Sequence, residues 1–349
     1  MKRMNLKIVV AVIAVSLFSC GNPETVVTDI VHPDGSVTRK VEIRNSKNEF
    51  KLRSVQVPID ETWNIRDSIE IGKKGDTTWV RRATKSFANV SQLNRMYRAD
   101  SSTNNESVRH AEFSKHFRWF NTEYFFSETI EKNLGNGYPI KEFLNDEQLE
   151  YFYMPDKMKE EHLKSADSLK YRALADTLDK RKDKWEGRSI ISEWISEFDR
   201  LAGSPREKEL TLASMKEQEG SIVGVFEKHQ NVFDSVWASG VIVREIFGDK
   251  LAAKYRVPAD SAMSVVIKKA LISFSDYTIR IEMPGRLTGT NGLIDSSRRL
   301  AWPVKSDYFF TEPYIMWAES KTTNVWAWIV TGAFIVFVVT GLVVRKVRK

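Results

Sequence analysis

The segment LISFSDYTIRIEM (residues 271–283) has the apolar and β-branched pattern of a β-strand, and it follows a long section of helical pattern. Two further strand patterns come after it, RRLAWPVK (298–305) and YFFTEPYIMWAES (308–320). Pro284-Gly285 and Asn291-Gly292 mark turns after the first pattern. Strand patterns also open the chain. Because strands stand at both ends of one domain, we expect the two groups to share one composite sheet.

The N-terminal strand patterns form two pairs, each around a turn. TVVTDIV (25–31) and SVTRKVEIR (36–44) flank HPDG, while TWNIRDSIEI (62–71) and TTWVRRATKSF (77–87) flank GKKGD. We predict a β-meander over residues 25–87. The stretch FSKHFRWFNTEYFF (113–126) has aromatic residues at odd and even positions alike, which predicts one central strand covered on both faces. Core packing is favoured there over an aromatic ligand platform.

Between the two groups of strands, from Tyr138 to about Leu271, the apolar residues recur with helical spacing. The strongest stripe consists of Ile190, Ile191, Trp194, Ile195, Phe198 and Leu201. The predicted fold class is therefore α+β. An antiparallel sheet combines strands from a β-rich N-terminal part (20–127) with C-terminal strands (271–320), and a helical subdomain (128–270) lies between them.

The first nineteen residues are typical of an export signal. Lys2, Arg3 and Lys7 precede an uncharged run from Ile8 to Phe18, which is too short to span a bilayer as a helix. The single cysteine of the chain, Cys20, follows directly. An exported protein with one cysteine forms no internal disulfide, so Cys20 needs another role. We predict a signal peptide over residues 1–19 and acylation of Cys20; a free thiol beside an ordinary signal is the alternative.

The C-terminal end predicts a second anchor. Residues 325–344, VWAWIVTGAFIVFVVTGLVV, are twenty residues without a charge, which matches a hydrocarbon core of roughly 30 Å. Trp326 and Trp328 are expected at the outer membrane–water interface. The basic tail (345–349) follows the span and is expected in the cytoplasm; its charged residues are Arg345, Lys346, Arg348 and Lys349.

The two ends together predict a topology. Export of residue 21 onward and a cytoplasmic tail require both anchors to lie in the same cytoplasmic membrane, with an extracytoplasmic, periplasmic domain between them. Only Gly21 to Glu24 and Lys321 to Asn324 are left as linkers, and four extended residues reach roughly 14 Å. The domain is therefore expected close to the membrane, with partners in or near it.

The net charge of +7 does not indicate a nucleic-acid partner. Seven basic residues lie in the two anchor segments, and without them the chain has 46 basic against 46 acidic residues. The domain is neutral, and it has no basic stripe with interleaved aromatic residues. The excess charge instead follows from the membrane topology.

Sequence motifs nominate no reaction. The chain has no P-loop, G-x-S-x-G, H-E-x-x-H, S-x-x-K or C-x-x-C motif, and we expect no cofactor and no metal. His110, Glu112 and His116 share a parity, but on a strand the two histidines lie roughly 20 Å apart, too far for one ion. His229 falls on an apolar helical stripe, where a hydrogen-bonded core histidine is favoured over a general base.

Two resemblances add to these patterns. Leu17-Phe18-Ser19-Cys20 resembles the lipobox of bacterial lipoproteins, and with the turn-rich start it resembles uncharacterised lipoproteins of Bacteroidota-type bacteria. MPGRLTGTNGLIDSSRRLAW (283–302), followed by strands and a membrane helix, resembles the end of the mycobacterial LppM-like lipoprotein domain. That resemblance implies an exposed β-rich domain. The long helical section departs from the family, so no site residues are carried over.

Three functions remain open. We favour a non-enzymatic, membrane-tethered module that binds or scaffolds envelope proteins, with membrane lipids and an envelope protein as partners. A carrier of lipid or apolar ligand needs an enclosed apolar pocket that opens toward the bilayer. An envelope hydrolase, an enzyme on cell-wall or lipid substrates, needs a polar cleft with convergent carboxylates and at least one strongly perturbed pKa. Whether the protein is an enzyme stays undecided, as do the ligand, the oligomeric state and the independence of the helical section.

Overall fold

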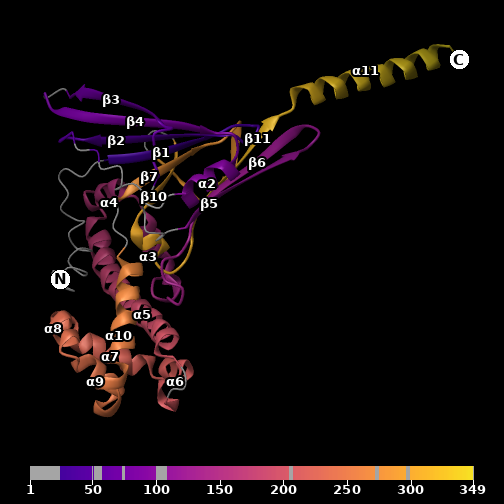
Figure 1. The fold of residues 1–349 in the computed structure, drawn as a ribbon. Coiled ribbons are helices and arrows are strands. Elements are labelled where there is room, and N and C mark those ends of the chain that lie inside the picture. Colours follow the sequence, from indigo (N-terminus) through magenta and orange to yellow (C-terminus); the bar gives the residue numbers. More distant parts are fainter. Residues whose placement is uncertain are drawn as a thin grey trace.

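The computed structural model describes residues 24–48, 50, 57–72, 75–99, 108–203, 207–271, 275–295 and 299–348. The predicted signal peptide and Cys20 lie outside these residues. Figure 1 shows two β-sheets at one end of the molecule, a helical region that extends away from them, and a C-terminal helix that projects on its own. The fold is mixed α and β with mainly antiparallel strands, as predicted from the sequence.

One sheet has seven strands and joins both ends of the chain. Its order is β3-β4-β2-β1-β7-β10-β9. The N-terminal strands are β1 (Glu24–Val31), β2 (Val37–Asn45), β3 (Asn64–Ile71) and β4 (Thr77–Phe87), and the C-terminal ones are β7 (Tyr277–Glu282), β9 (Leu293–Ile294) and β10 (Leu300–Val304). The join is the pairing of β1 with β7, and it is parallel. The expectation that the two ends share a sheet is therefore confirmed.

The second sheet has four strands in the order β5-β6-β11-β8. They are β5 (Arg109–Phe117), β6 (Asn121–Ile130), β8 (Arg286–Thr290) and β11 (Tyr314–Thr323). This sheet also combines both ends of the chain, so the single composite sheet expected from the sequence is divided into two. The first part of the predicted strand 308–320 is instead a 3₁₀ turn, η5 (Ser306–Phe309).

Two local predictions were wrong. Residues 25–87 are not a meander, because β2 pairs with β4 rather than with β3, and β3 forms the edge. Residues 113–126 are not one strand, because they form a hairpin: β5 pairs with β6, and Arg118 to Phe120 make its turn. The aromatic residues at both parities therefore belong to two strands and a turn, and only some of them are buried.

The helical region lies between β6 and β7, close to the range predicted. Its α-helices are α3 (Asp146–Tyr153), α4 (Asp156–Leu163), α5 (Ser168–Ala202), α6 (Leu212–Glu217), α7 (Glu219–His229), α8 (Phe233–Ala238), α9 (Val241–Phe247) and α10 (Asp249–Ala270). Short 3₁₀ turns are η2 (Ile140–Glu142), η3 (Lys208–Leu210) and η4 (Gln230–Val232), and α2 (Val90–Ala99) lies earlier, between β4 and β5.

The 35-residue helix α5 connects two hydrophobic cores. Its first half contributes Leu178 and Trp185 to the core that both sheets share with α3. Its second half contributes Trp194 and Phe198 to a separate core formed with α6 to α10. At 1.5 Å per residue α5 is about 52 Å long, so it carries the α6–α9 end of the molecule away from the sheets.

The C-terminal helix α11 (Val325–Val347) follows β11 after a single residue, Asn324. It contains the whole predicted span 325–344. Figure 1 shows that it leaves the sheet end of the molecule and that the sheets lie between it and the α6–α9 end. The expected linker Lys321–Asn324 is therefore shorter than predicted, because β11 continues through Thr323.

Candidate membrane interface

Helix α11 meets the requirements of a membrane span in length, composition and exposure. It has 23 residues, and only 6% of its most apolar window is buried within the protein. A length of about 34 Å exceeds the roughly 30 Å hydrocarbon core of a bilayer by a few ångströms. A core helix of a globular protein would be covered on one side, and α11 is not. These properties are compatible with membrane association.

The predicted interface residues of α11 lie at its two ends. Trp326 and Trp328 are in its first turn, whereas Arg345 and Lys346 are in its last turn and Arg348 caps it. Lys349 and Cys20 lie outside the described residues. The described anchor residues thus have the polarity expected of a span: aromatic rings at the domain end and positive charges at the free end.

Asn324 fixes the joint between the domain and α11. Its backbone N–H donates to the carbonyl of Phe120 at 3.0 Å, and its side-chain Nδ2 donates to the carbonyl of Arg118 at 2.7 Å. Its Oδ1 accepts a hydrogen bond from Thr122 Oγ1 at 2.9 Å. The turn of the β5–β6 hairpin is therefore held against the start of α11, and the helix cannot swing freely about its one-residue linker.

Aromatic side chains of this hairpin turn pack on the first turns of α11. Phe117 stacks on Trp326 with ring centroids 6.2 Å apart, and Trp119 meets the same indole edge-on at 5.2 Å. Phe120 contacts Trp328 at 4.3 Å. All five rings are 37–58% exposed, so they form one exposed aromatic cluster. The sequence indicated the two tryptophans of α11 but not their three partners.

Three residues of β5, His110, Glu112 and His116, were considered as metal ligands and set aside because of their spacing. Among the described residues, no three His, Cys, Asp or Glu side chains converge in a way that fits a metal ion. His110 instead has Glu131 as its neighbour, with Nδ1 and Oε1 3.5 Å apart. His229 in α7 is largely buried and hydrogen-bonds Glu245 at 3.1 Å, which fits the structural role expected for it.

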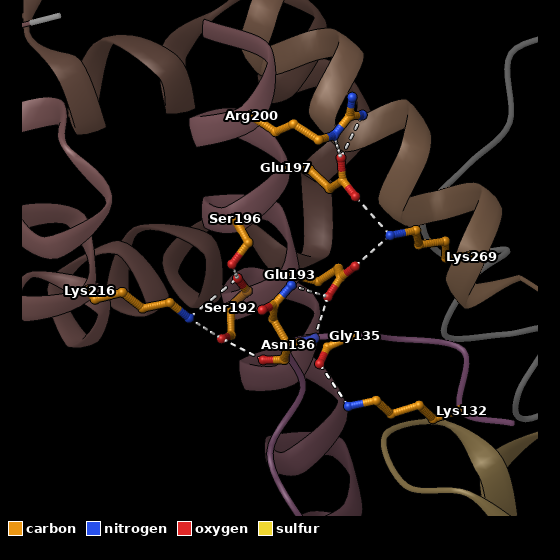
Figure 2. A network of polar contacts seen from close by, with 10 residues as sticks. All are labelled: Lys132, Gly135, Asn136, Ser192, Glu193, Ser196, Glu197, Arg200, Lys216 and Lys269. Atoms are coloured by element: carbon orange, nitrogen blue, oxygen red, sulfur yellow. Dashed lines mark hydrogen bonds and ion pairs between the residues drawn. The ribbon is translucent and has the colours of Figure 1, made fainter. Parts of the chain in front are cut away.

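A polar network in the helical region contains the residue types of a catalytic site but serves as a connection (Figure 2). Glu193 of α5 is buried and accepts hydrogen bonds from the backbone N–H of Asn136 at 2.7 Å and from Lys269 Nζ at 2.6 Å. Lys269 also donates to Glu197 at 2.7 Å. These bonds tie α5 to α10 and to the loop that follows β6.

Ser192 and Lys216 in the same network have the residue types of a serine–lysine nucleophile pair. Lys216 Nζ donates to Ser192 Oγ, and Ser192 Oγ donates to the carbonyl of Asn136 at 2.8 Å. The hydroxyl proton is thus directed at a backbone carbonyl rather than at the amine. Ser192 is only 1% exposed, so a substrate cannot approach it. We interpret the pair as a structural latch between helix and loop.

Four buried charges lie where the two sheets meet. Arg39 of β2 makes two hydrogen bonds of 2.6 Å to Asp29 of β1 and donates a further one to Glu128 of β6. Nη2 of Arg109 in β5 lies 3.3 Å from Oε1 of Glu128. The hydroxyl of Tyr97 donates a hydrogen bond of 2.9 Å to the same Glu128 oxygen. Burial raises the pKa of Glu128, but the charges of Arg39 and Arg109 outweigh this and leave that pKa below its usual value.

Two large pKa shifts of acid–base groups lie between α4, α5 and η5. Burial lowers the pKa of the Lys159 ammonium to about 8 and raises the pKa of the Glu186 carboxyl to about 7. Lys182 bridges Glu186 at 3.4 Å and Asp307 at 2.5 Å, and Lys305 pairs with Asp156 at 2.5 Å. This cluster, defined here as the α4–α5–η5 charge cluster, meets two of the three requirements of the hydrolase alternative, which are convergent carboxylates and a strongly perturbed pKa.

The carrier alternative requires an enclosed apolar cavity. A depression beside the β1–β2 turn is lined by His32, Pro33, Asp34, Ser36, Thr38 and Ser86. It is open to solvent, and His32 and Thr38 at its base are hydrogen-bonded to each other at 3.1 Å. This depression is therefore not a lipid-sized apolar cavity.

Comparison of the chain with protein-family models, with curated proteins and with solved structures finds no match.

Proposed function

We propose that this protein is a doubly anchored extracytoplasmic lipoprotein of the cytoplasmic membrane, which acts as a non-enzymatic binding or scaffolding module for envelope proteins. The observation that carries the proposal is the exposed apolar helix α11, which continues directly from β11 of the second sheet. The lipobox-like segment at Cys20 supports a second anchor, and the basic end of α11 supports a cytoplasmic tail.

The architecture supports a scaffold because the molecule has two distinct ends. The sheet end carries α11, and α5 carries the helices α6 to α9 away from it (Figure 1). The second hydrophobic core gives those helices a stability of their own. The neutral domain charge argues against a polyanionic partner, so a protein surface is the partner that fits best.

Extraction of the full chain in a mild detergent, followed by native mass spectrometry, tests this proposal. A protein companion at fixed stoichiometry supports the scaffold. A retained lipid on an otherwise solitary protein would instead favour the carrier. The matched control is a chain with Cys20→Ser, which keeps α11 and should keep the same companion, since the proposed binding surface lies in the domain.

An envelope hydrolase is the second candidate, because the α4–α5–η5 charge cluster combines carboxylates with a lysine of lowered pKa. Incubation of the detergent-solubilised chain with peptidoglycan fragments and with phospholipids tests for turnover. Loss of any observed turnover in Lys159→Met, with retention in Lys170→Met, would support catalysis at the cluster. Lys170 is a suitable control because its ion pair with Glu147 is exposed.

A further inference from the structure

We propose that the tip of the β5–β6 hairpin, formed by Phe117, Trp119 and Phe120, is itself a lipid-binding element that inserts into the outer leaflet beside α11. The proposal rests on the membrane span proposed above and extends it. In this proposal the exposed aromatic cluster contacts the interfacial layer of the bilayer. The hairpin would then set the depth of α11 and the orientation of the domain.

The hairpin tip lies beside the first turns of α11. Trp119 Nε1 donates a hydrogen bond to Thr331 Oγ1 at 2.9 Å. Thr331 lies six residues after the start of α11, which is about 9 Å along the helix axis. The hairpin tip therefore accompanies the helix for almost two turns instead of ending where the helix begins.

The second argument is the length of helix that the bilayer requires. From Val325 to Val344 the uncharged segment measures about 29 Å, close to the roughly 30 Å of the hydrocarbon core. With Arg345 at the cytoplasmic boundary, the outer boundary falls near the first turn of α11. The segment from Thr331 to Val344 alone measures only about 20 Å. A hairpin that reaches Thr331 must therefore lie at the outer interface or below it.

The third argument is the hydrogen bonding of the turn. Asn324 donates to the carbonyls of Arg118, Trp119 and Phe120, and the indole N–H of Trp119 has Thr331 as its acceptor. A turn in water would need none of these bonds, because solvent would supply partners. In a bilayer interface they lower the cost of removing polar groups from water. The same turn directs its apolar rings outward, where Phe117 is 58% exposed.

The side-chain chemistry also fits this layer of the membrane. Trp rings are favoured at the level of the lipid headgroups, and Phe is common on the apolar face of interfacial elements. The two tryptophans of α11 lie at the same level as the hairpin rings. Arg118, between Phe117 and Trp119, is exposed and pairs with Glu123 at 3.2 Å, so its charge is partly balanced at the membrane surface. A continuous apolar surface from hairpin to helix results.

Depth-dependent fluorescence quenching tests the proposal in the full chain. In a Cys20→Ser background, which is free of cysteine, single variants Phe120→Cys, Ile335→Cys and Val257→Cys are labelled with an environment-sensitive dye. Each is reconstituted into phosphatidylcholine–phosphatidylglycerol vesicles that carry a quencher near the headgroup or near the chain end. Ile335 lies in α11, and Val257 is exposed in α10 of the helical region.

We expect the label at position 120 to be quenched about twofold more strongly by the headgroup-proximal quencher, and the label at position 335 by the deeper one. The label at position 257 should respond to neither. A label at 120 that behaves like the one at 257, while 335 is quenched, would overturn the hairpin proposal and leave the span intact. Loss of quenching at 335 would overturn the span, and the hairpin proposal with it.

A protein occupant of the cluster is distinguished by the same variants. If the tip binds a second copy of the chain or another membrane protein, lipid quenching at position 120 is weak and chemical crosslinking from that position gives a discrete larger species. That outcome overturns insertion into lipid. A Phe120→Ser variant, which removes one ring and leaves Asn324 untouched, should shift the label at a neighbouring Phe117→Cys toward water if the rings insert together.

Discussion

Replacing Arg39 by methionine should strongly destabilise the junction of the two sheets. Arg39 is fully buried, and its guanidinium is shared between Asp29 and Glu128. In Arg39→Met the length of the side chain is nearly kept, so packing changes little. Asp29, however, loses the guanidinium that donates two hydrogen bonds to it. Glu128 keeps Arg109 and Tyr97. The variant therefore leaves a buried carboxylate without its main partner.

The magnitude follows from the cost of breaking a buried ion pair, about 3–5 kcal/mol. At roughly 2 °C per kcal/mol for a domain of this size, the melting temperature should fall by about 6–10 °C. The double variant Asp29→Val with Arg39→Met removes both charges. It should recover much of the loss, because apolar replacement of a buried pair is often close to neutral.

The assay is thermal unfolding of the full chain in detergent, with tryptophan fluorescence as the readout. Arg82→Met is the matched control, because Arg82 of β4 also bridges two carboxylates, Glu42 and Glu70, but does so at the surface. We expect a loss below about 1 kcal/mol for this control. The reasoning is refuted if Arg39→Met and Arg82→Met have similar melting temperatures, or if the double variant is less stable than Arg39→Met alone.

Three further predictions concern other parts of the chain. The folded-state pKa of Glu186 is raised to about 7, so protonation of this carboxyl stabilises the folded protein. The melting temperature should therefore fall more steeply between pH 4.5 and 7 in the natural chain than in Glu186→Gln. Equal slopes in the two chains would contradict this. Asn324→Ala removes the side-chain hydrogen bonds to the hairpin turn, each worth about 1 kcal/mol. Amide hydrogen exchange at residues 118–122 should therefore become roughly tenfold faster or more, while exchange in β7 stays unchanged. Unchanged exchange at residues 118–122 would show that Asn324 does not hold the turn. Cys20→Ser should abolish fatty-acid labelling and leave the chain in the membrane fraction; release into the soluble fraction would count against α11 as an anchor, and persistent labelling against the lipobox.

The period of two along the strands predicted most of the architecture. It identified β1, β2, β3 and β4 as strands and indicated that the two ends of the chain meet, as the pairing of β1 with β7 confirms. It did not predict which strands pair. The β2–β4 pairing depends on contacts between strands far apart in sequence, and residues 46–63 separate β2 from β3. Periodicity carries no information about such long-range choices.

The hairpin β5–β6 was missed for a physical reason that the sequence contains. Asn121 follows Phe120 at the turn, and asparagine is typical of turns, but the aromatic residues on both sides gave a stronger strand signal. Three of them, Phe117, Trp119 and Phe120, are exposed; they pack on α11 and, by our proposal, face lipid. An apolar turn is an error signal in a water-soluble domain, whereas next to a membrane span it is consistent with the surroundings.

Two of the buried charges, Asp29 and Arg39, could have been predicted from the sequence. Asp29 has the parity of Val27 and Val31, and Arg39 has the parity of Val37 and Val41, so a regular hairpin places one acid and one base on the core face. The register of β1 and β2 then sets the two directly opposite each other. Glu128 was not predictable in this way, because it arrives from the second sheet through a tertiary contact.

The connections between α11 and the α6–α9 end determine where a partner can be bound. Asn324 clamps the helix to the hairpin, β11 lies inside the second sheet, and that sheet shares its core with the first half of α5. Beyond Trp185 the rest of α5 adds about 25 Å before Ala202. Each of these connections is a packed or hydrogen-bonded element rather than a flexible linker. With α11 in the bilayer, as we propose, a partner of the α6–α9 end would be held at a fixed distance from the membrane, so we expect the partner to be a membrane protein or a protein bound at the membrane surface.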